Sequence, residues 1–352
     1  MTTIQKLQNE LKAGEAMLII SGANRLYFSG LKSSAGILFV TKDSADFLID
    51  FRYYEKAIKS VHICNVVLLE KASVQLQELA KKHGVQTVFI ETSSITVAEK
   101  NRYNEIFGNI SEDAKLDHKI IAMRRIKTPT ELENIKRAQK ITDDTFSYIL
   151  GQICPGQTER ELMLEMEFYL RKQGSEGVSF DFIVVSGKNS SLPHGVPTDK
   201  AIKKGDFITM DFGAVVSGYR SDMTRTVAVG SVSEKQKAVY ETVLAAQQRA
   251  LDAIAPGKIC KDIDAAARDY IYSNGYKGYF GHGLGHGVGI EIHEGPCFNT
   301  SDETVLVPGM VITVEPGIYL PNEFGVRIED MVVITENAYE NITNSNKELI
   351  VL

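Results

Sequence analysis

The stretch Lys204–Gly230 reads KGDFITMDFGAVVSGYRSDMTRTVAVG and decides the fold of the second half of this 352-residue chain. Its runs of β-branched and aromatic residues predict one strand over 207–212 and a second over 222–229. Ser217 and Gly218, which lie between these runs, are typical of a tight turn. The stretch therefore predicts an antiparallel hairpin.

Two acidic residues interrupt this hairpin, Asp211 on the first strand and Asp222 at the start of the second. With the turn at that place, Gly213 faces Asp222. Because side chains alternate along a strand, Asp211 and Asp222 lie diagonally on one face, with β-carbons about 7 Å apart. Two carboxylates on a largely apolar sheet repel each other, and a cation between them removes that cost.

A second pair of acids interrupts a second predicted hairpin. Its strands cover 310–315 and 325–334, and Glu315 and Glu329 stand in otherwise β-branched runs. One such acid alone is as well explained by a solvated sheet end or by an arginine partner. Four acids in two similar pairs favour a cation site, because buried acids are rarely left unpaired.

The two hairpins form part of an internal repeat. Pro155-Gly156 opens one predicted helix, and Pro256-Gly257 opens another 101 residues later. Asp211 matches Glu315 within its strand at a shift of 104 residues. A duplicated helix-then-hairpin unit therefore predicts that Asp211 and Glu315 lie on equivalent strands.

Three of the seven histidines, His282, His286 and His293, fall within twelve residues of a glycine-rich stretch. Glycines at this density let the backbone approach a ligand closely. The stretch lacks the lysine of a phosphate-binding loop, so we disfavour that interpretation. Another histidine, His194, stands in the predicted loop Ser191–Gly195.

Four carboxylates with one imidazole make an oxygen-rich site, which suits Mn²⁺, Co²⁺, Fe²⁺ or Zn²⁺. Two metals bridged by carboxylates commonly activate one water for hydrolysis.

The rest of the chain predicts a second, smaller domain. Short strands alternate with helical stretches in the first part, and the strands are expected at 16–20, 36–40, 46–50 and 85–90. Thr128, Pro129 and Glu131 then have the form of a capping box that starts a long helix. We expect a small α/β N-terminal domain over 1–122 and an α+β catalytic domain with the internal repeat over 123–352.

The composition is that of an ordinary globular protein, with 43% hydrophobic residues, 24% charged residues and a net charge of −6. No block of basic residues predicts nucleic-acid binding, and no apolar run predicts a membrane span or a signal peptide. The four cysteines are far apart and are expected to be reduced thiols. We therefore expect a cytoplasmic protein.

These motifs resemble those of the "pita-bread" metallopeptidases of the M24B type, which include prolidase and aminopeptidase P. The resemblance spans the whole second domain and rests on Met210–Gly213, Ser221–Thr226, the glycine-histidine stretch 281–294, Val314–Gly317 and Arg327–Asp330. The first domain is similar to the creatinase/prolidase N-terminal domain, most visibly at Ser21–Gly30. Methionine aminopeptidases, which share the second fold, typically lack that domain, so the resemblance favours the Xaa-Pro branch.

The resemblance implies a pita-bread fold and hydrolysis of the bond between an N-terminal residue and proline by a metal-bridging water. It implies two divalent ions, Mn²⁺ first and Co²⁺, Zn²⁺ or Fe²⁺ as alternatives, and these would be held by Asp211, Asp222, His286, Glu315 and Glu329. Glu315 would also handle the proton of the water. His194, His282 and His293 would bind substrate and stabilise the tetrahedral intermediate, and Tyr319 and Arg327 would support the site.

By analogy the resemblance also implies a homodimer that acts on small peptides with proline at the second position. Many prolidases carry an arginine shortly after the His-Glu of the third histidine motif, but here His293-Glu294 is followed by Gly295–Phe298 without one. Longer substrates that begin with Xaa-Pro therefore remain open beside dipeptides. A non-catalytic peptide-binding protein, a creatine-amidinohydrolase-type enzyme and an aminopeptidase of other specificity are the alternatives on the same fold.

Overall fold

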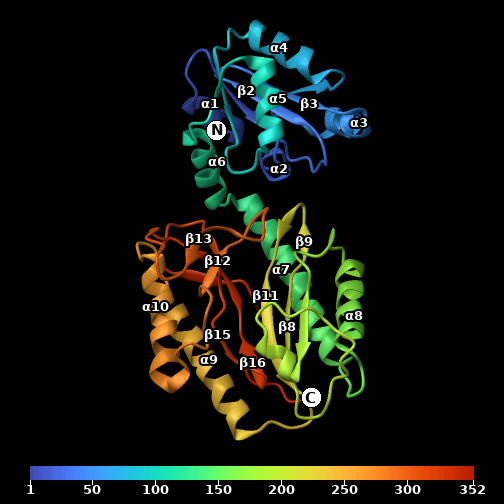
Figure 1. Ribbon diagram of the computed structural model, residues 1–352, viewed down its shortest axis with the longest axis vertical. Coiled ribbons are helices and arrows are strands. Elements are labelled where there is room, and N and C mark those ends of the chain that lie inside the picture. Colours follow the sequence, from blue (N-terminus) through green and yellow to red (C-terminus); the bar gives the residue numbers. More distant parts are fainter. The chain divides into compact units, whose positions relative to one another are not determined.

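The computed structural model describes the whole chain, residues 1–352, as two compact units, Met1–Arg124 and Arg125–Leu352 (Figure 1). None of the helices combines the length and the apolar character that crossing a bilayer requires. Each unit has its own sheets and its own buried core.

The first unit is built on a six-stranded mixed sheet with the order β4-β3-β2-β1-β5-β6. Strands β1, β2 and β3 pair antiparallel, whereas β4, β5 and β6 join parallel to their neighbours. The strands are β1 Glu15–Ile19, β2 Ile37–Thr41, β3 Ala45–Ile49, β4 Asn65–Leu68, β5 Thr87–Ile90 and β6 Ile110–Ser111. The helices are α1 Thr3–Glu10, α2 Gly22–Ser29, α3 Phe51–Ser60, α4 Ala72–Lys82, α5 Val97–Phe107 and α6 Lys115–Arg125, which crosses into the second unit. The four strands expected from the sequence are all present within two residues of their predicted bounds.

The second unit places its strands between two pairs of helices, α7 with α8 on one side and α9 with α10 on the other (Figure 1). The helices are α7 Pro129–Leu150, α8 Glu159–Lys172, α9 Glu234–Ala253 and α10 Cys260–Ile271. The strands of the first half are β7 Ile183–Ser186, β8 Phe207–Phe212, β9 Val215–Val216, β10 Tyr219–Arg220 and β11 Met223–Ala228. Those of the second half are β12 Gly285–Gly287, β13 Glu294–Phe298, β14 Val311–Val314, β15 Gly317–Leu320, β16 Phe324–Arg327, β17 Asp330–Ile334 and β18 Tyr339–Asn341.

The helix starts follow the predicted capping signatures. Thr128 caps α7 with Glu131 closing the capping box, and Thr158 and Ser233 do the same for α8 and α9. Each cap satisfies backbone N–H groups that the helix cannot pair itself. These signals fix where the helices begin against the sheets.

The internal repeat appears as two sheets with related hairpins, β11-β8-β7 and β13-β12-β14-β17-β18. The first packs against α7 and α8 through one apolar cluster, and the second packs against α9 and α10 through another. The predicted helix-then-hairpin duplication is therefore confirmed as α8 with β8 and β11, and α10 with β14 and β17.

Candidate metal centre

The first hairpin has the predicted register. Val216 pairs with Tyr219 in the turn, and Thr224 pairs with Asp211 in the ladder. Continuing that register sets Gly213 against Asp222, as the sequence predicts. A β-carbon on Gly213 would meet the Ser221 carbonyl oxygen at 1.9 Å, so only glycine allows the two strands to approach here.

The second hairpin differs in one respect from the sequence interpretation. Val314 pairs with Asp330, so continuing the register sets Glu315 against Glu329 directly and not diagonally. Glu329 thus takes the place that Thr224 has in the first hairpin, and the two acid pairs are not equivalent in register. The single strand predicted over 325–334 is broken between β16 and β17, and at this break the Glu329 backbone bonds to Thr224 of β11.

Hydrogen bonds across that break bring the acids of the two halves together. The Glu329 backbone N–H donates to the Thr224 carbonyl oxygen at 3.1 Å, and the Thr224 hydroxyl donates to Glu329 Oε2 at 2.7 Å. The Thr226 hydroxyl donates to the Arg327 carbonyl at 3.0 Å. Thr224 was missed by the sequence analysis, although it lies two residues after Asp222 and therefore on the same face.

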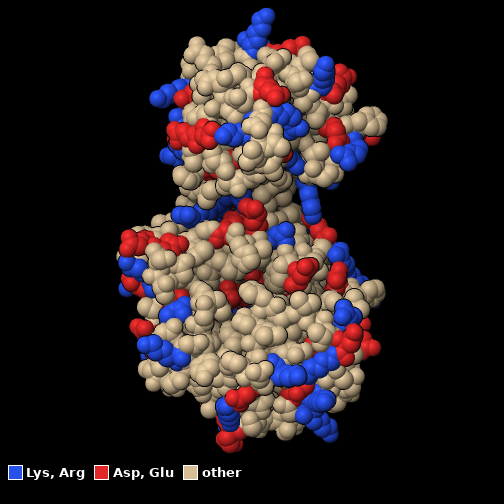
Figure 2. Space-filling view, viewed as in Figure 1, with Lys and Arg blue, Asp and Glu red and all other residues tan.

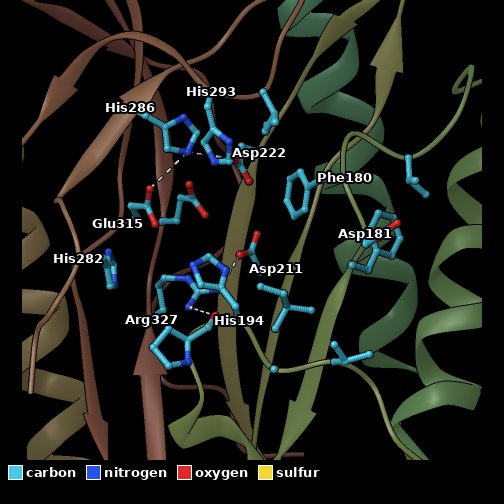
Figure 3. A pocket seen from close by; sticks show the side chains of 18 of the residues that line it. Phe180, Asp181, His194, Asp211, Asp222, His282, His286, His293, Glu315 and Arg327 are labelled. Atoms are coloured by element: carbon cyan, nitrogen blue, oxygen red, sulfur yellow. Dashed lines mark hydrogen bonds and ion pairs between the residues drawn. The ribbon is translucent and has the colours of Figure 1, made fainter.

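The His286 imidazole lies between acids from both halves (Figure 3). Its Nε2 is 3.4 Å from Glu315 Oε1 and 3.5 Å from Asp222 Oδ2. One side-chain donor atom each of Asp222, His286 and Glu329 lies within 4.8 Å of the other two. Nδ1 of His286 is 3.1 Å from the Gly287 carbonyl oxygen. Since a carbonyl can only accept, Nδ1 carries the proton and Nε2 offers its lone pair to the acids' side.

Asp211 is joined to this group through an arginine. Arg327 Nη2 donates to Asp211 Oδ2 at 2.5 Å, and Arg327 Nη1 donates to the Tyr319 hydroxyl oxygen at 2.8 Å. Tyr319 in turn lies 2.9 Å from His282 Nε2, and His282 Nδ1 lies 2.7 Å from the Gly283 carbonyl. By the same carbonyl argument Nδ1 of His282 is protonated, so the Tyr319 hydroxyl donates to Nε2. A continuous buried chain of hydrogen bonds thus runs from His282 to Asp211.

The remaining two histidines face the same cavity. The His293 ring packs edge-on against the His286 ring, with centroids 4.5 Å apart. His194 lies beside Arg327 and Asp211 (Figure 3). A cavity of about 770 Å³ is lined by nine of the residues that the sequence singles out: His194, His282, His286, His293, Asp211, Asp222, Glu315, Glu329 and Arg327. Tyr319 is buried and does not line it. Red acidic side chains are visible in the otherwise tan middle of the second unit (Figure 2).

Burial makes these acids costly to ionise. Desolvation, followed by the neighbouring carboxylates of Glu329, Asp211 and Glu315, raises the pKa of Asp222 well above its usual range. Desolvation with the Glu315 and Asp211 charges does the same to the pKa of Glu329. Desolvation raises the pKa of Glu315 to about 8, although Arg327 opposes it. Desolvation also lowers the pKa of His286 to about 4, so its imidazole is neutral near pH 7 and cannot balance the acids.

Three observations of this structure indicate that these residues are suited to bind a pair of divalent cations. Asp211 Oδ1 and Asp222 Oδ1 are buried and have no hydrogen-bond partner. The His286 separations of 3.4 and 3.5 Å match the roughly 3.4 Å expected between two atoms bound tetrahedrally to one ion. The donors are carboxylate oxygens and one neutral imidazole, which suit divalent first-row metals.

Comparison with known proteins shows which family this chain belongs to. Residues 133–336 match the model of metallopeptidase family M24, and residues 3–126 match the creatinase/prolidase N-terminal domain. The chain belongs to metallopeptidase family M24, and it is a peptidase.

Named relatives and solved structures agree with this assignment. The chain is 42% identical over 338 residues to a Xaa-Pro dipeptidase from Pyrococcus furiosus, covering 96% of this chain and 95% of that one. It is similar to the structure of a Xaa-Pro dipeptidase from Bacillus anthracis, with a TM-score of 0.95, 41% identity and 99% coverage of both chains. It is also similar to an X-Pro aminopeptidase from Thermotoga maritima, with a TM-score of 0.92, 34% identity and coverage of 99% and 100%. The predicted creatinase/prolidase-like and pita-bread folds are confirmed.

Proposed function

We propose that this chain hydrolyses the bond between an N-terminal residue and proline in small peptides, using two divalent metal ions. The observation that carries the proposal is the convergence of Asp222, His286 and Glu329 within 4.8 Å in a buried cavity that three further histidines line. The names of the relatives, which include Xaa-Pro dipeptidases and an X-Pro aminopeptidase, support the same substrate class.

In this proposal Asp211, Asp222, His286, Glu315 and Glu329 would hold the two ions. When bound, two divalent cations supply Lewis-acid activation of a water molecule and of the scissile carbonyl. Mn²⁺ is our first choice for the ions, with Co²⁺, Zn²⁺ and Fe²⁺ as alternatives.

The protein's own residues then orient substrate and move protons. Glu315, which lines the cavity, takes the proton of the attacking water. His194 and His293, which line the cavity, donate to the oxygen of the tetrahedral intermediate. Both ring nitrogens of His282 have protein partners, Nδ1 the Gly283 carbonyl and Nε2 the Tyr319 hydroxyl. His282 would therefore act through the hydrogen bonds that tie Tyr319 to Arg327 and Asp211, and not by donating to substrate.

Proline suits this arrangement for a chemical reason. The nitrogen of an Xaa-Pro bond is tertiary and has no N–H, so peptidases that bind that hydrogen fail on it. A site that grips the free amine and the carbonyl needs no such donor.

We further propose that residues 123–352 form the catalytic domain, that 1–122 form the N-terminal domain, and that the protein is a cytoplasmic homodimer. The four free cysteines, none of them in a disulfide, support the cytoplasmic assignment. Light scattering of the full chain tests the dimer, since a monomeric mass at micromolar concentration contradicts it.

The test of the proposed function is reconstitution. The chain is stripped of metal and then loaded separately with Mn²⁺, Co²⁺, Zn²⁺ or Fe²⁺. Each form is assayed on Ala-Pro, on a longer peptide that begins with Ala-Pro, and on the same peptide with alanine in place of proline. We expect metal-dependent cleavage of at least one proline peptide and little cleavage of the control. Equal cleavage of the control would indicate an aminopeptidase of other specificity, and no cleavage with any metal would support a binding protein.

A further inference from the structure

One buried carboxylate of the second unit lies outside the metal centre and has no part in the proposed chemistry. It belongs to Glu159, the first residue of α8, which is 0% exposed. Its Oε1 accepts from the Ser186 backbone N–H at 2.7 Å and from the Ser186 hydroxyl at 2.9 Å. Its Oε2 accepts from the Thr198 backbone N–H at 3.1 Å and from the Thr198 hydroxyl at 2.6 Å. The Asn189 side-chain amide lies 3.1 Å from both oxygens, so five donor groups surround this carboxylate.

These donors enclose the loop that carries His194. Ser186 ends β7, and Thr198 follows four residues after His194. We call residues 187–197 the His194 loop, which begins with a 3₁₀-helix over Gly187–Ser191. The Glu159 carboxylate therefore holds both ends of the His194 loop and, through Asn189, its first turn.

The place of the His194 ring depends on the backbone of this loop. His282 and His286 each bond to a backbone carbonyl through Nδ1, whereas the His194 imidazole makes no hydrogen bond to another residue. Inside the loop, the Pro193 carbonyl accepts from Arg327 Nη1 at 3.2 Å. A loop that moves at its ends therefore moves an imidazole that nothing else orients.

The elements around Glu159 do not need its carboxylate to form. The start of α8 has its own capping box, Thr158 with Glu161, and β7 pairs with β8 as far as Ser186. Burying a carboxylate is costly unless hydrogen bonds replace its water. Here every such bond goes to the ends or the first turn of the His194 loop, which indicates that the loop is what the carboxylate serves.

We infer that Glu159 is a positioning residue for the reaction, which keeps the His194 imidazole where it can donate to the tetrahedral intermediate. This inference rests on the proposed function, because it takes His194 as that donor. Glu159 does not line the cavity, so it acts only through His194. Misplacing a reacting group by about 1 Å can cost about 10²-fold in rate.

The first experiment uses Glu159→Gln, which keeps the shape of the side chain and turns one oxygen into an NH2 group. Because each carboxylate oxygen accepts from one backbone N–H, the amide leaves the N–H of either Ser186 or Thr198 facing another donor. We expect kcat on the best proline peptide to fall about 10- to 100-fold, with KM changed less than kcat and metal content unchanged. An unchanged kcat overturns the inference.

The second experiment combines Glu159→Gln with His194→Ala. If Glu159 acts through His194, its substitution should lower the kcat of the His194→Ala protein by no more than about twofold. The matched control is Glu161→Ala, which removes a carboxylate that caps the same helix through Thr158. We expect it to lower Tm and leave kcat unchanged. Losses that multiply in the double variant, or a control that loses as much kcat as Glu159→Gln, overturn the inference.

A milder variant, Thr198→Val, decides the matter where Glu159→Gln does not fold. It removes one of the donors to the carboxylate and leaves the backbone N–H in place. We expect kcat to fall by about two- to tenfold, and only while His194 is present. A full kcat, or the same loss in the His194→Ala protein, overturns the inference.

The third experiment reads the position of the ring without activity. A proton–carbon NMR spectrum of the metal-free chain with labelled histidine is recorded for the wild type and for Glu159→Gln, and the His194 signal is identified by its loss in His194→Ala. We expect this signal to shift or broaden in Glu159→Gln while those of His282 and His286 stay in place. A His194 signal that stays in place overturns the inference. If the wild type cleaves no proline peptide, the proposed function fails, and the spectrum still decides whether Glu159 places His194.

Discussion

Replacing Asp222 by asparagine is expected to stabilise the metal-free protein and to weaken its metal binding. Asp222 is 4% exposed, and its donor atom lies within 4.8 Å of that of Glu329. Two full charges at that distance repel by about 3.5 kcal/mol at an effective dielectric constant near 20. Because their pKa values are raised, these acids retain part of their protons near neutral pH. We therefore expect the substitution to relieve about 1–2 kcal/mol of the charge repulsion.

The same substitution removes a stabilisation that the wild type gains from metal. Ligand at 100 times its dissociation constant stabilises a folded protein by about 2.7 kcal/mol. In a unit of this size each kcal/mol moves Tm by roughly 2–4 °C. The wild-type Tm should therefore rise by about 5–11 °C on adding metal. The Tm of the metal-free variant should lie about 2–8 °C above that of the metal-free wild type, and it should rise little when metal is added.

The assay is differential scanning calorimetry of metal-free and metal-loaded protein, with metal content measured by mass spectrometry on the same samples. Asparagine keeps the shape of Asp222, and the Asp222 Oδ1 atom has no hydrogen-bond partner to lose. A variant that melts below the wild type without metal, or that binds metal and gains Tm like the wild type, would refute the reasoning.

Three further predictions concern the surrounding residues. His293→Ala should lower kcat by about 10²–10³-fold with metal content unchanged, and loss of metal as well would mean that His293 is itself a ligand. Tyr319→Phe removes the donor to His282 and the acceptor for Arg327, so it should lower the free energy of unfolding by about 1.5–3 kcal/mol; denaturant unfolding with an unchanged midpoint contradicts this. Glu315, whose pKa burial raises to about 8, keeps its proton in the folded metal-free protein longer than in the unfolded chain. His286, whose pKa burial lowers to about 4, acts in the opposite direction below about pH 6.5, because the unfolded imidazole binds a proton there. The Tm of the metal-free protein should therefore fall as pH rises from about 6.5 to about 8, and a Tm that rises over this range counts against buried, uncompensated acids.

Local signals predicted much of the fold. The capping boxes at Thr128, Thr158 and Ser233 gave the helix starts, and the turn at Ser217-Gly218 gave the register of the first hairpin. Such signals act over a few residues, so the sequence carries them directly. The break between β16 and β17 was not predicted, because no proline or glycine after Gly325 in the run 325–334 marks Ile328 as its end.

The sequence predicted the residues of the candidate site better than it predicted the hydrogen bonds between them. The four acids and the one imidazole stand out as polar residues in apolar or glycine-rich runs. The contact of Glu329 with Thr224 joins residues 105 positions apart, and the chain from Arg327 through Tyr319 to His282 depends on how three elements pack. Pairings of this kind are set by tertiary packing, which spacing along one strand does not encode.

We propose that Asp211, Asp222, His286, Glu315 and Glu329 together hold two divalent cations. Crystals of the protein grown with Mn²⁺ test it most directly through an anomalous difference map recorded near the manganese absorption edge. We expect two strong peaks per chain, both enclosed by these five side chains and both lost in Asp222→Asn. A map with no peak there, or with manganese bound only at other residues while the protein cleaves proline peptides, would contradict it.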